Sequence, residues 1–102
     1  MKSLALIATA LAFVATPALA DPEAAMNKAG CMACHSKDKK LVGPSFKDIA
    51  AKYKGKDASA QLAEKVRKGG SGVFGPIPMA PNGPDKISDA DLKAAVDFIL
   101  KS

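Results

Sequence analysis

Large apolar and aromatic side chains are scarce in this sequence of 102 residues. There is no Trp, there is one Tyr, and there are four Phe. A domain this small buries little surface, so the shortage predicts that a disulfide, a metal or a cofactor helps to stabilise the fold. Histidine occurs once and cysteine twice, which argues against a zinc site, because such a site takes four ligands.

The sequence also lacks an apolar run long enough to cross a membrane. Its longest run, residues 4–14, falls short of the roughly 20 helical residues that a bilayer requires. With Lys2 before it and a small-residue cleavage site ending at Ala20, this run is typical of a secretory signal peptide. We therefore predict a signal peptide at residues 1–20 and one domain at residues 21–102, which is exported to the periplasm as a soluble protein.

Acidic residues are outnumbered, with 10 Asp and Glu against 15 Lys and Arg. A basic surface attracts nucleic acid, membranes or acidic proteins. Export argues against nucleic acid, and the basic residues are not interleaved with aromatic side chains that could stack on bases. No long basic amphipathic helix favours a membrane surface. Two interpretations remain open: a docking face for acidic protein partners, and a solvated face that only keeps the protein soluble.

Period-two alternation is absent, and the apolar residues instead follow helical spacing. The pattern predicts an all-α domain. Capping residues and apolar stripes place its helices at about residues 21–34, 45–53 and 59–68, with a final helix opening at Ser88.

Residues 69–84 form a long segment in which nine of sixteen residues are Gly or Pro. This composition is typical of a flexible linker. The segment also carries Val73, Phe74, Ile77 and Met79, however, and a linker that contacts nothing has no use for large apolar side chains. A structureless segment of this length in a small domain favours a functional loop.

Cys31, Cys34 and His35 form the C-x-x-C-H motif by which c-type haem is attached. On a helix the two cysteines share a face, so both thiols could reach the vinyl groups at one edge of a porphyrin. His35 projects from the same face toward the iron. Alternatives for the cysteines are a disulfide, which closes a loop too short to stabilise much, and a thioredoxin-like pair, which needs a βαβ context that is missing.

Haem iron has a second axial position, and the sequence offers one residue for it. His35 is the only histidine, so two-histidine ligation is impossible. Met1 leaves with the signal peptide, Met32 lies inside the motif, and Met26 is expected on the same helix as His35. Met79 alone is free to approach from the opposite side, and His with Met ligation suits electron transfer.

The motif at residues 30–35, the turn at 42–44, the run at 72–79 with Pro-Asn after it, and the final helix resemble the monohaem class I cytochromes c of the cytochrome c-551 type. The resemblance covers nearly all of the chain after residue 20. It implies an all-α fold of about four helices around one covalent haem c, with the first and last helices crossing near Gly30.

The same resemblance implies roles for several residues. Cys31 and Cys34 match the thioether cysteines, and His35 and Met79 match the axial iron ligands. It also implies that the Pro44 carbonyl accepts the other N–H of the axial histidine, and that Asn82 forms a hydrogen bond near the methionine. Two positions depart from the family: Phe74 stands where Trp is common and has no N–H to donate to a haem propionate, and Lys65 stands where Arg is often found.

These observations predict a monomeric electron carrier that serves redox partner proteins with acidic docking faces. A haem enzyme such as a peroxidase is the first rival, but it needs an open iron position and a distal acid or base, and no second histidine exists. A sensor or interaction module with an exchangeable Met79 is the second rival. Binding of carbon monoxide to the reduced protein would separate the carrier from both.

Overall fold

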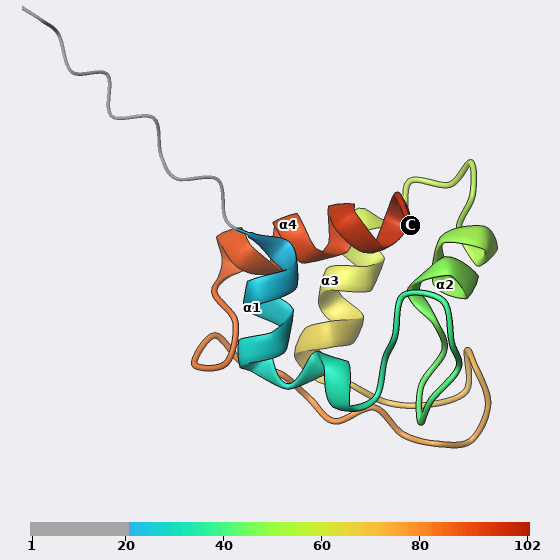
Figure 1. Ribbon diagram of the computed structural model, residues 1–102, viewed down its shortest axis with the longest axis horizontal. Coiled ribbons are helices and arrows are strands. Elements are labelled where there is room, and N and C mark those ends of the chain that lie inside the picture. Colours follow the sequence, from blue (N-terminus) through green and yellow to red (C-terminus); the bar gives the residue numbers. More distant parts are fainter. Residues whose placement is uncertain (1–20) are drawn as a thin grey trace, which may run out of the picture.

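The computed structural model describes residues 21–102, and the predicted signal peptide lies outside this part of the chain. The described residues form four α-helices and one 3₁₀ turn (Figure 1), and these are α1 (Pro22–Ala29), η1 (Cys31–Ala33), α2 (Phe46–Lys52), α3 (Ser59–Lys68) and α4 (Asp89–Leu100). Within that range there is no β-strand, and only two isolated backbone bridges occur. The predicted all-α class is confirmed.

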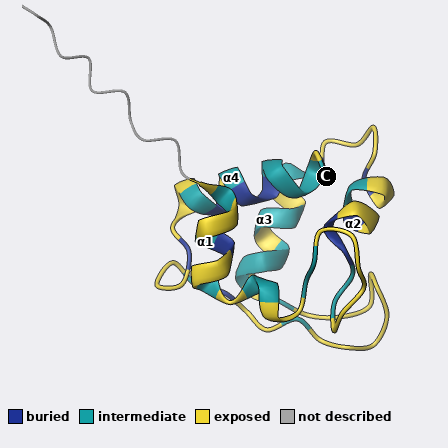
Figure 2. Cartoon of the chain, viewed as in Figure 1, coloured by how far each residue is buried: buried dark blue, intermediate teal, exposed yellow. Residues whose placement is uncertain are grey.

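Helix α4 is the centre of the packing, because it contacts α1, α2 and α3. It buries Leu92, Ala95 and Val96 on one face, and Figure 2 shows the buried residues gathered where the helices meet. The core contains nine buried hydrophobic residues, which are Met26, Phe46, Ile49, Tyr53, Ala58, Ile87, Leu92, Ala95 and Val96. Two of these nine are alanines, so the core is as thin as the composition predicts.

Polar side chains cap the N-termini of α1, α2 and α4 at the positions that the sequence predicts. Asp21 accepts hydrogen bonds from the first backbone amides of α1, the Ser45 hydroxyl accepts one from Asp48 N at 3.1 Å, and the Ser88 hydroxyl accepts one from Asp91 N at 3.2 Å. Each cap satisfies an amide that has no partner inside the helix. The predicted limits of α3 at residues 59–68 agree with the structure.

The first helix is shorter than its predicted extent to residue 34. It ends at Ala29 because Gly30 takes a left-handed conformation with a φ of 85°, and the Gly30 N–H closes the helix on Asn27 O and Met26 O. Glycine adopts this conformation without steric cost, which makes it a common helix terminator. The prediction that the first helix continues to Cys34 is therefore wrong: Cys31 begins a separate 3₁₀ turn, and Cys34 follows directly after it.

The Gly- and Pro-rich segment at residues 69–84 is held at several points along its length. Gly70 and Met79 exchange a pair of backbone hydrogen bonds of 3.0 and 2.9 Å, and Asn82 N donates to Val66 O at 2.9 Å. Gly69 packs so tightly that a Cβ atom there would lie 2.3 Å from Met79 O and 2.9 Å from the Ala80 carbonyl carbon. The flexible-linker interpretation is thus not supported.

We predict that Gly69→Ala lowers the free energy of unfolding by at least about 2 kcal/mol, since the site combines a φ of 68° and a ψ of −155° with this close approach. Gly55→Ala is the matched control, because Gly55 has a φ of 77° but open space around its Cβ position. That control should cost about 1 kcal/mol. Denaturant unfolding of both variants measures the difference, and equal costs would contradict the tight contact between Gly69 and Met79.

Candidate functional site

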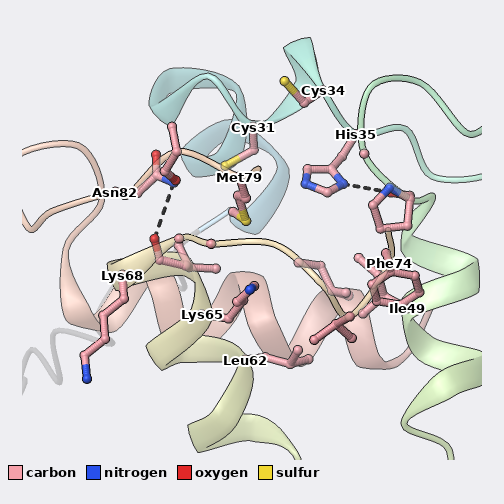
Figure 3. Close-up of a pocket in the computed structure, with 18 of the residues that line it drawn as sticks. Cys31, Cys34, His35, Ile49, Leu62, Lys65, Lys68, Phe74, Met79 and Asn82 are labelled. Carbon is pink, nitrogen blue, oxygen red and sulfur yellow. Dashed lines mark hydrogen bonds between the residues drawn. The ribbon is translucent and has the colours of Figure 1, made fainter. Parts of the chain in front are cut away.

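A cavity of about 540 Å³ lies between the helices and the segment that follows α3 (Figure 3). Its apolar wall includes Met26 from α1, Ile49 from α2, Leu62 from α3 and Val96 from α4. All the residues that the sequence analysis selects for the site line it, namely Cys31, Cys34, His35, Pro44, Met79 and Asn82. The fold thus brings together side chains that are up to about fifty positions apart in the sequence.

The His35 imidazole is fixed through one of its two ring nitrogens. Its Nδ1 lies 2.7 Å from Pro44 O, and because a carbonyl oxygen can only accept, Nδ1 must carry the proton. This leaves the lone pair of Nε2 free to bind a metal. A Cβ atom at Gly43 would lie 2.6 Å from His35 Cε1, and the Phe46 ring stacks at 5.6 Å on the imidazole. The ring orientation is therefore set by contacts on several sides.

Met79 is the methionine that lies across the cavity from this imidazole. Figure 3 shows the two side chains facing each other, with Met79 coming from the segment after α3. Met26 is 1% exposed and belongs to the core. The expectation that Met26 shares a helix with His35 is wrong, because α1 ends at Ala29. Met26 is nevertheless part of the core cluster among the helices, and it also lines the wall of the same cavity.

Asn82 fixes the backbone just after Met79. Its side chain is buried, and Nδ2 donates to Ala80 O at 3.1 Å and to Val66 O at 3.4 Å. Together with the bond from its own backbone N–H to Val66 O, these contacts join the methionine segment to the last turn of α3. Ala80 follows Met79 directly, so the Asn82 amide acts on the neighbouring peptide.

The two cysteines lie on and directly after η1 at the edge of the cavity. In a 3₁₀ turn, with three residues per turn, residues three apart point the same way. Cys31 is half-buried, and burial raises the pKa of its thiol, whereas Cys34 is exposed. The two cysteines are not joined to each other in a disulfide. In the described part of the chain no three His, Cys, Asp or Glu residues are grouped so that they could hold a metal ion.

The two positions that depart from the family pattern also lie on the cavity wall. Phe74 is 41% exposed, and the Lys52 ammonium lies over its ring at 5.4 Å from the centroid. Such a contact stabilises the ring position modestly. Lys65 reaches into the cavity in Figure 3, where a Cβ atom at Gly70 would lie 3.2 Å from its Nζ.

The cavity fits the expected haem in size and in chemistry. Cofactor sites typically enclose about 300 to 1,000 Å³ and have mostly apolar walls with a few placed polar groups. Here the walls are mainly apolar, and the groups that could attach or ligate a haem include the His35 imidazole nitrogen, the Met79 thioether sulfur and the thiols of Cys31 and Cys34. These are the groups by which proteins attach and ligate a c-type haem.

Three contributors to the site were not identified from the sequence. Gly43 allows the backbone to approach His35, Gly69 allows α3 to approach Met79, and Arg67 bonds the chain beyond Asn82. The sequence indicates no more than a turn at residues 42–44 and a Gly-rich segment that begins at residue 69. No local pattern indicates the role of Arg67, because its partners lie 15 to 22 residues away.

The chain matches the family model described as Cytochrome c over residues 20–102. It is 52% identical to cytochrome c2 of Rubrivivax gelatinosus, covering 81% of this chain and 99% of that protein. It is 44% identical to cytochrome c-551 of Pseudomonas aeruginosa, covering 78% and 75%. The crystal structure of wild-type Nitrosomonas europaea cytochrome c552 superposes with a TM-score of 0.70 at 51% identity, covering 76% of this chain and 95% of that one.

These matches agree with the helical fold and with the donor set of the cavity, and they confirm the resemblance on which the sequence analysis relied. The chain therefore belongs to the cytochrome c family, as an all-α class I protein with a single covalently attached haem c that serves electron transfer.

Proposed function

We propose that this cytochrome c is a periplasmic electron carrier whose haem iron is held by His35 and Met79. The observation that carries the proposal is the pair of facing side chains: an imidazole whose Nδ1 is bonded to Pro44 O, and a thioether on the other side of the same cavity. Once bound, the haem supplies one-electron chemistry between Fe(III) and Fe(II). In this proposal, both His35 and Met79 remain bound when the iron is oxidised and when it is reduced.

The two proposed ligands are positioned by different segments of the chain. His35 is oriented by Gly43, Pro44 and Phe46, while Met79 is oriented by Gly70 and Asn82. Because separate segments fix the two ligands, the ligands should move little when the iron gains or loses an electron, which lowers the reorganisation energy of electron transfer. Occupation of both axial positions also closes the iron to small molecules, which supports a carrier over an enzyme.

Cys31 and Cys34 are the proposed attachment points. Each thiol would add across one vinyl group, so that a carbon–sulfur bond forms and the thiol hydrogen goes to the neighbouring vinyl carbon. Because Cys34 is exposed, the attached edge of the cofactor would lie near the protein surface. Electron exchange with a partner would then take place at that edge.

The predicted signal peptide supports a periplasmic location, with the chain cleaved after Ala20. Among the described residues no helix has the length and apolar character needed to cross a bilayer. We propose a monomer that accepts electrons from one respiratory redox protein and donates them to another.

Attachment predicts that the denatured protein has no thiol that reacts with iodoacetamide. The peptide containing Cys31 and Cys34 should carry the mass of one haem after acid–acetone extraction. Changing both residues to Ala should abolish covalent attachment, whereas Met32→Ala, inside the same motif, should leave it intact. Two alkylated thiols on a colourless wild-type chain would contradict the assignment.

Ligation by Met79 predicts that Met79→Ala loses the weak red absorption band of ferric iron bound to thioether sulfur. The variant should have a lower reduction potential and should bind carbon monoxide readily when reduced. Met32→Ala again serves as the control and should keep both the band and the resistance to carbon monoxide. If the band survives in Met79→Ala, another residue is the ligand.

The basic residues of this protein differ in whether they form ion pairs within the chain. Lys68 pairs with Glu64 at 2.6 Å and Arg67 with Asp89 at 2.6 Å, so two cations at the end of α3 have partners within the protein. The basic residues that flank the haem motif are exposed, and these are Lys28, Lys37, Lys39 and Lys40. We propose that they steer acidic partners toward the cysteine edge of the cofactor.

An apolar surface competes with these lysines as the recognition element. Val42, Val73, Phe74 and Ile77 are between 41% and 58% exposed and lie at the mouth of the cavity. Weak electron-transfer contacts often combine an apolar centre with a charged rim. Salt dependence separates the two, because only the charged contribution is screened over a Debye length of about 8 Å.

Steering by charge predicts that the bimolecular rate with a cognate reductase or oxidase falls as ionic strength rises. At low salt, Lys39→Gln with Lys40→Gln should slow the reaction roughly threefold to tenfold. Lys86→Gln with Lys93→Gln removes the same charge elsewhere and should change it little. A rate that is flat or rises with salt, and is equal in both double variants, would assign recognition to the apolar surface.

A further inference from the structure

Arg67 joins three parts of the chain through one side chain. It lies in the last turn of α3, and its side chain is 20% exposed. Its Nη1 donates to Ile87 O at 2.7 Å and to Asn82 O at 3.2 Å, while its Nη2 donates to Asp89 Oδ1 at 2.6 Å. A guanidinium presents its donors from separate nitrogens in a fixed plane, so Nη1 and Nη2 can reach acceptors on both sides at once, whereas an ammonium presents its three donors from one atom.

The three acceptors enclose the turn that leads from the methionine segment into α4. Within this turn, Lys86 N and Ile87 N both donate to Gly83 O. The carbonyls of Asn82 and Ile87 stand at its two ends and point to the same Nη1. Arg67 therefore fixes both ends of the turn relative to α3, while Asp89 links it to the first turn of α4.

This arrangement completes the support of Met79 on the downstream side. Upstream, the Gly70 backbone pair holds Met79 itself. Downstream, Asn82 bonds Ala80 O and Val66 O, and Arg67 in turn holds Asn82 O. We infer that Arg67 is a positioning residue that keeps the Met79 sulfur on the iron by anchoring the segment after it to α3. The inference rests on the proposed ligation by Met79.

A residue that positions Met79 affects how tightly the ferric iron binds an added ligand, whereas a residue that only stabilises the fold does not. A ligand such as imidazole can bind the ferric iron only in molecules from which Met79 has left. Its apparent dissociation constant therefore varies inversely with the population of that open form. Loosening the segment after Met79 should raise this population even where the protein as a whole remains folded.

The test is an imidazole titration of the ferric holoprotein, with Arg67→Met compared against Lys93→Met. Lys93 is exposed and pairs with Asp97, so the control also removes one positive charge and one ion pair, but from α4 away from the cavity. Arg67→Met should bind imidazole about tenfold more tightly than the wild type, since it loses hydrogen bonds made by a charged donor. Its red ferric band should weaken, and Lys93→Met should match the wild type.

Arg67→Lys tests the same point in a variant that keeps the charge and is expected to fold. An ammonium presents its three donors from one atom and should hold fewer of the acceptors, so imidazole affinity should rise to a value between those of the wild type and Arg67→Met. If both Arg67 variants lower the unfolding temperature while imidazole affinity and the red band stay at wild-type values, Arg67 only stabilises the fold and the inference is overturned. Failure of the proposed function looks different: the wild type itself would lack the band and bind imidazole as tightly as Met79→Ala.

Discussion

Burial of the haem against apolar walls drawn from every helix is the interaction on which the rest of the structure depends. The walls include Met26, Ile49, Leu62 and Val96, one from each α-helix, and the core of residues 21–102 contains nine buried hydrophobic residues. Such a core contributes little apolar contact for its size. A cofactor enclosed by all four helices supplies the shared surface that these side chains would otherwise have to supply to one another.

Enclosing a rigid planar group places demands on the backbone that side chains alone do not meet. Glycine lies at two places where the backbone comes closest to a proposed ligand, Gly43 beside the His35 ring and Gly69 beside the Met79 carbonyl. Each proposed ligand is also tied to a backbone partner, His35 to Pro44 O and Met79 to Gly70. Main-chain groups therefore help to position both proposed ligands, beside the side chains that line the cavity.

Local patterns predicted much of this structure, and the two features that they did not predict have different causes. The Ser45 and Ser88 caps and the limits of α3 depend on neighbouring residues, so the sequence alone was sufficient for them. The haem motif was equally local. The end of α1 was missed because Gly30 was read as part of the motif rather than as a left-handed terminator. Arg67 could not be assigned, because its partners are distant in sequence and only the fold brings them together.

The basic residues at the end of α3 differ in their contacts from those that flank the haem motif. In the sequence, the cations that end α3 and those that flank the motif look alike, as parts of one positive surface. In the structure, Arg67 bonds backbone carbonyls and Asp89, Lys68 pairs with Glu64, and Lys65 lines the cavity. Partners within the protein offset the charges of Arg67 and Lys68, so these two cations attract an approaching protein less. The proposed docking face therefore depends on the exposed lysines that flank the haem motif, on the side that carries Cys34, where the proposed attachment would bring the cofactor near the surface.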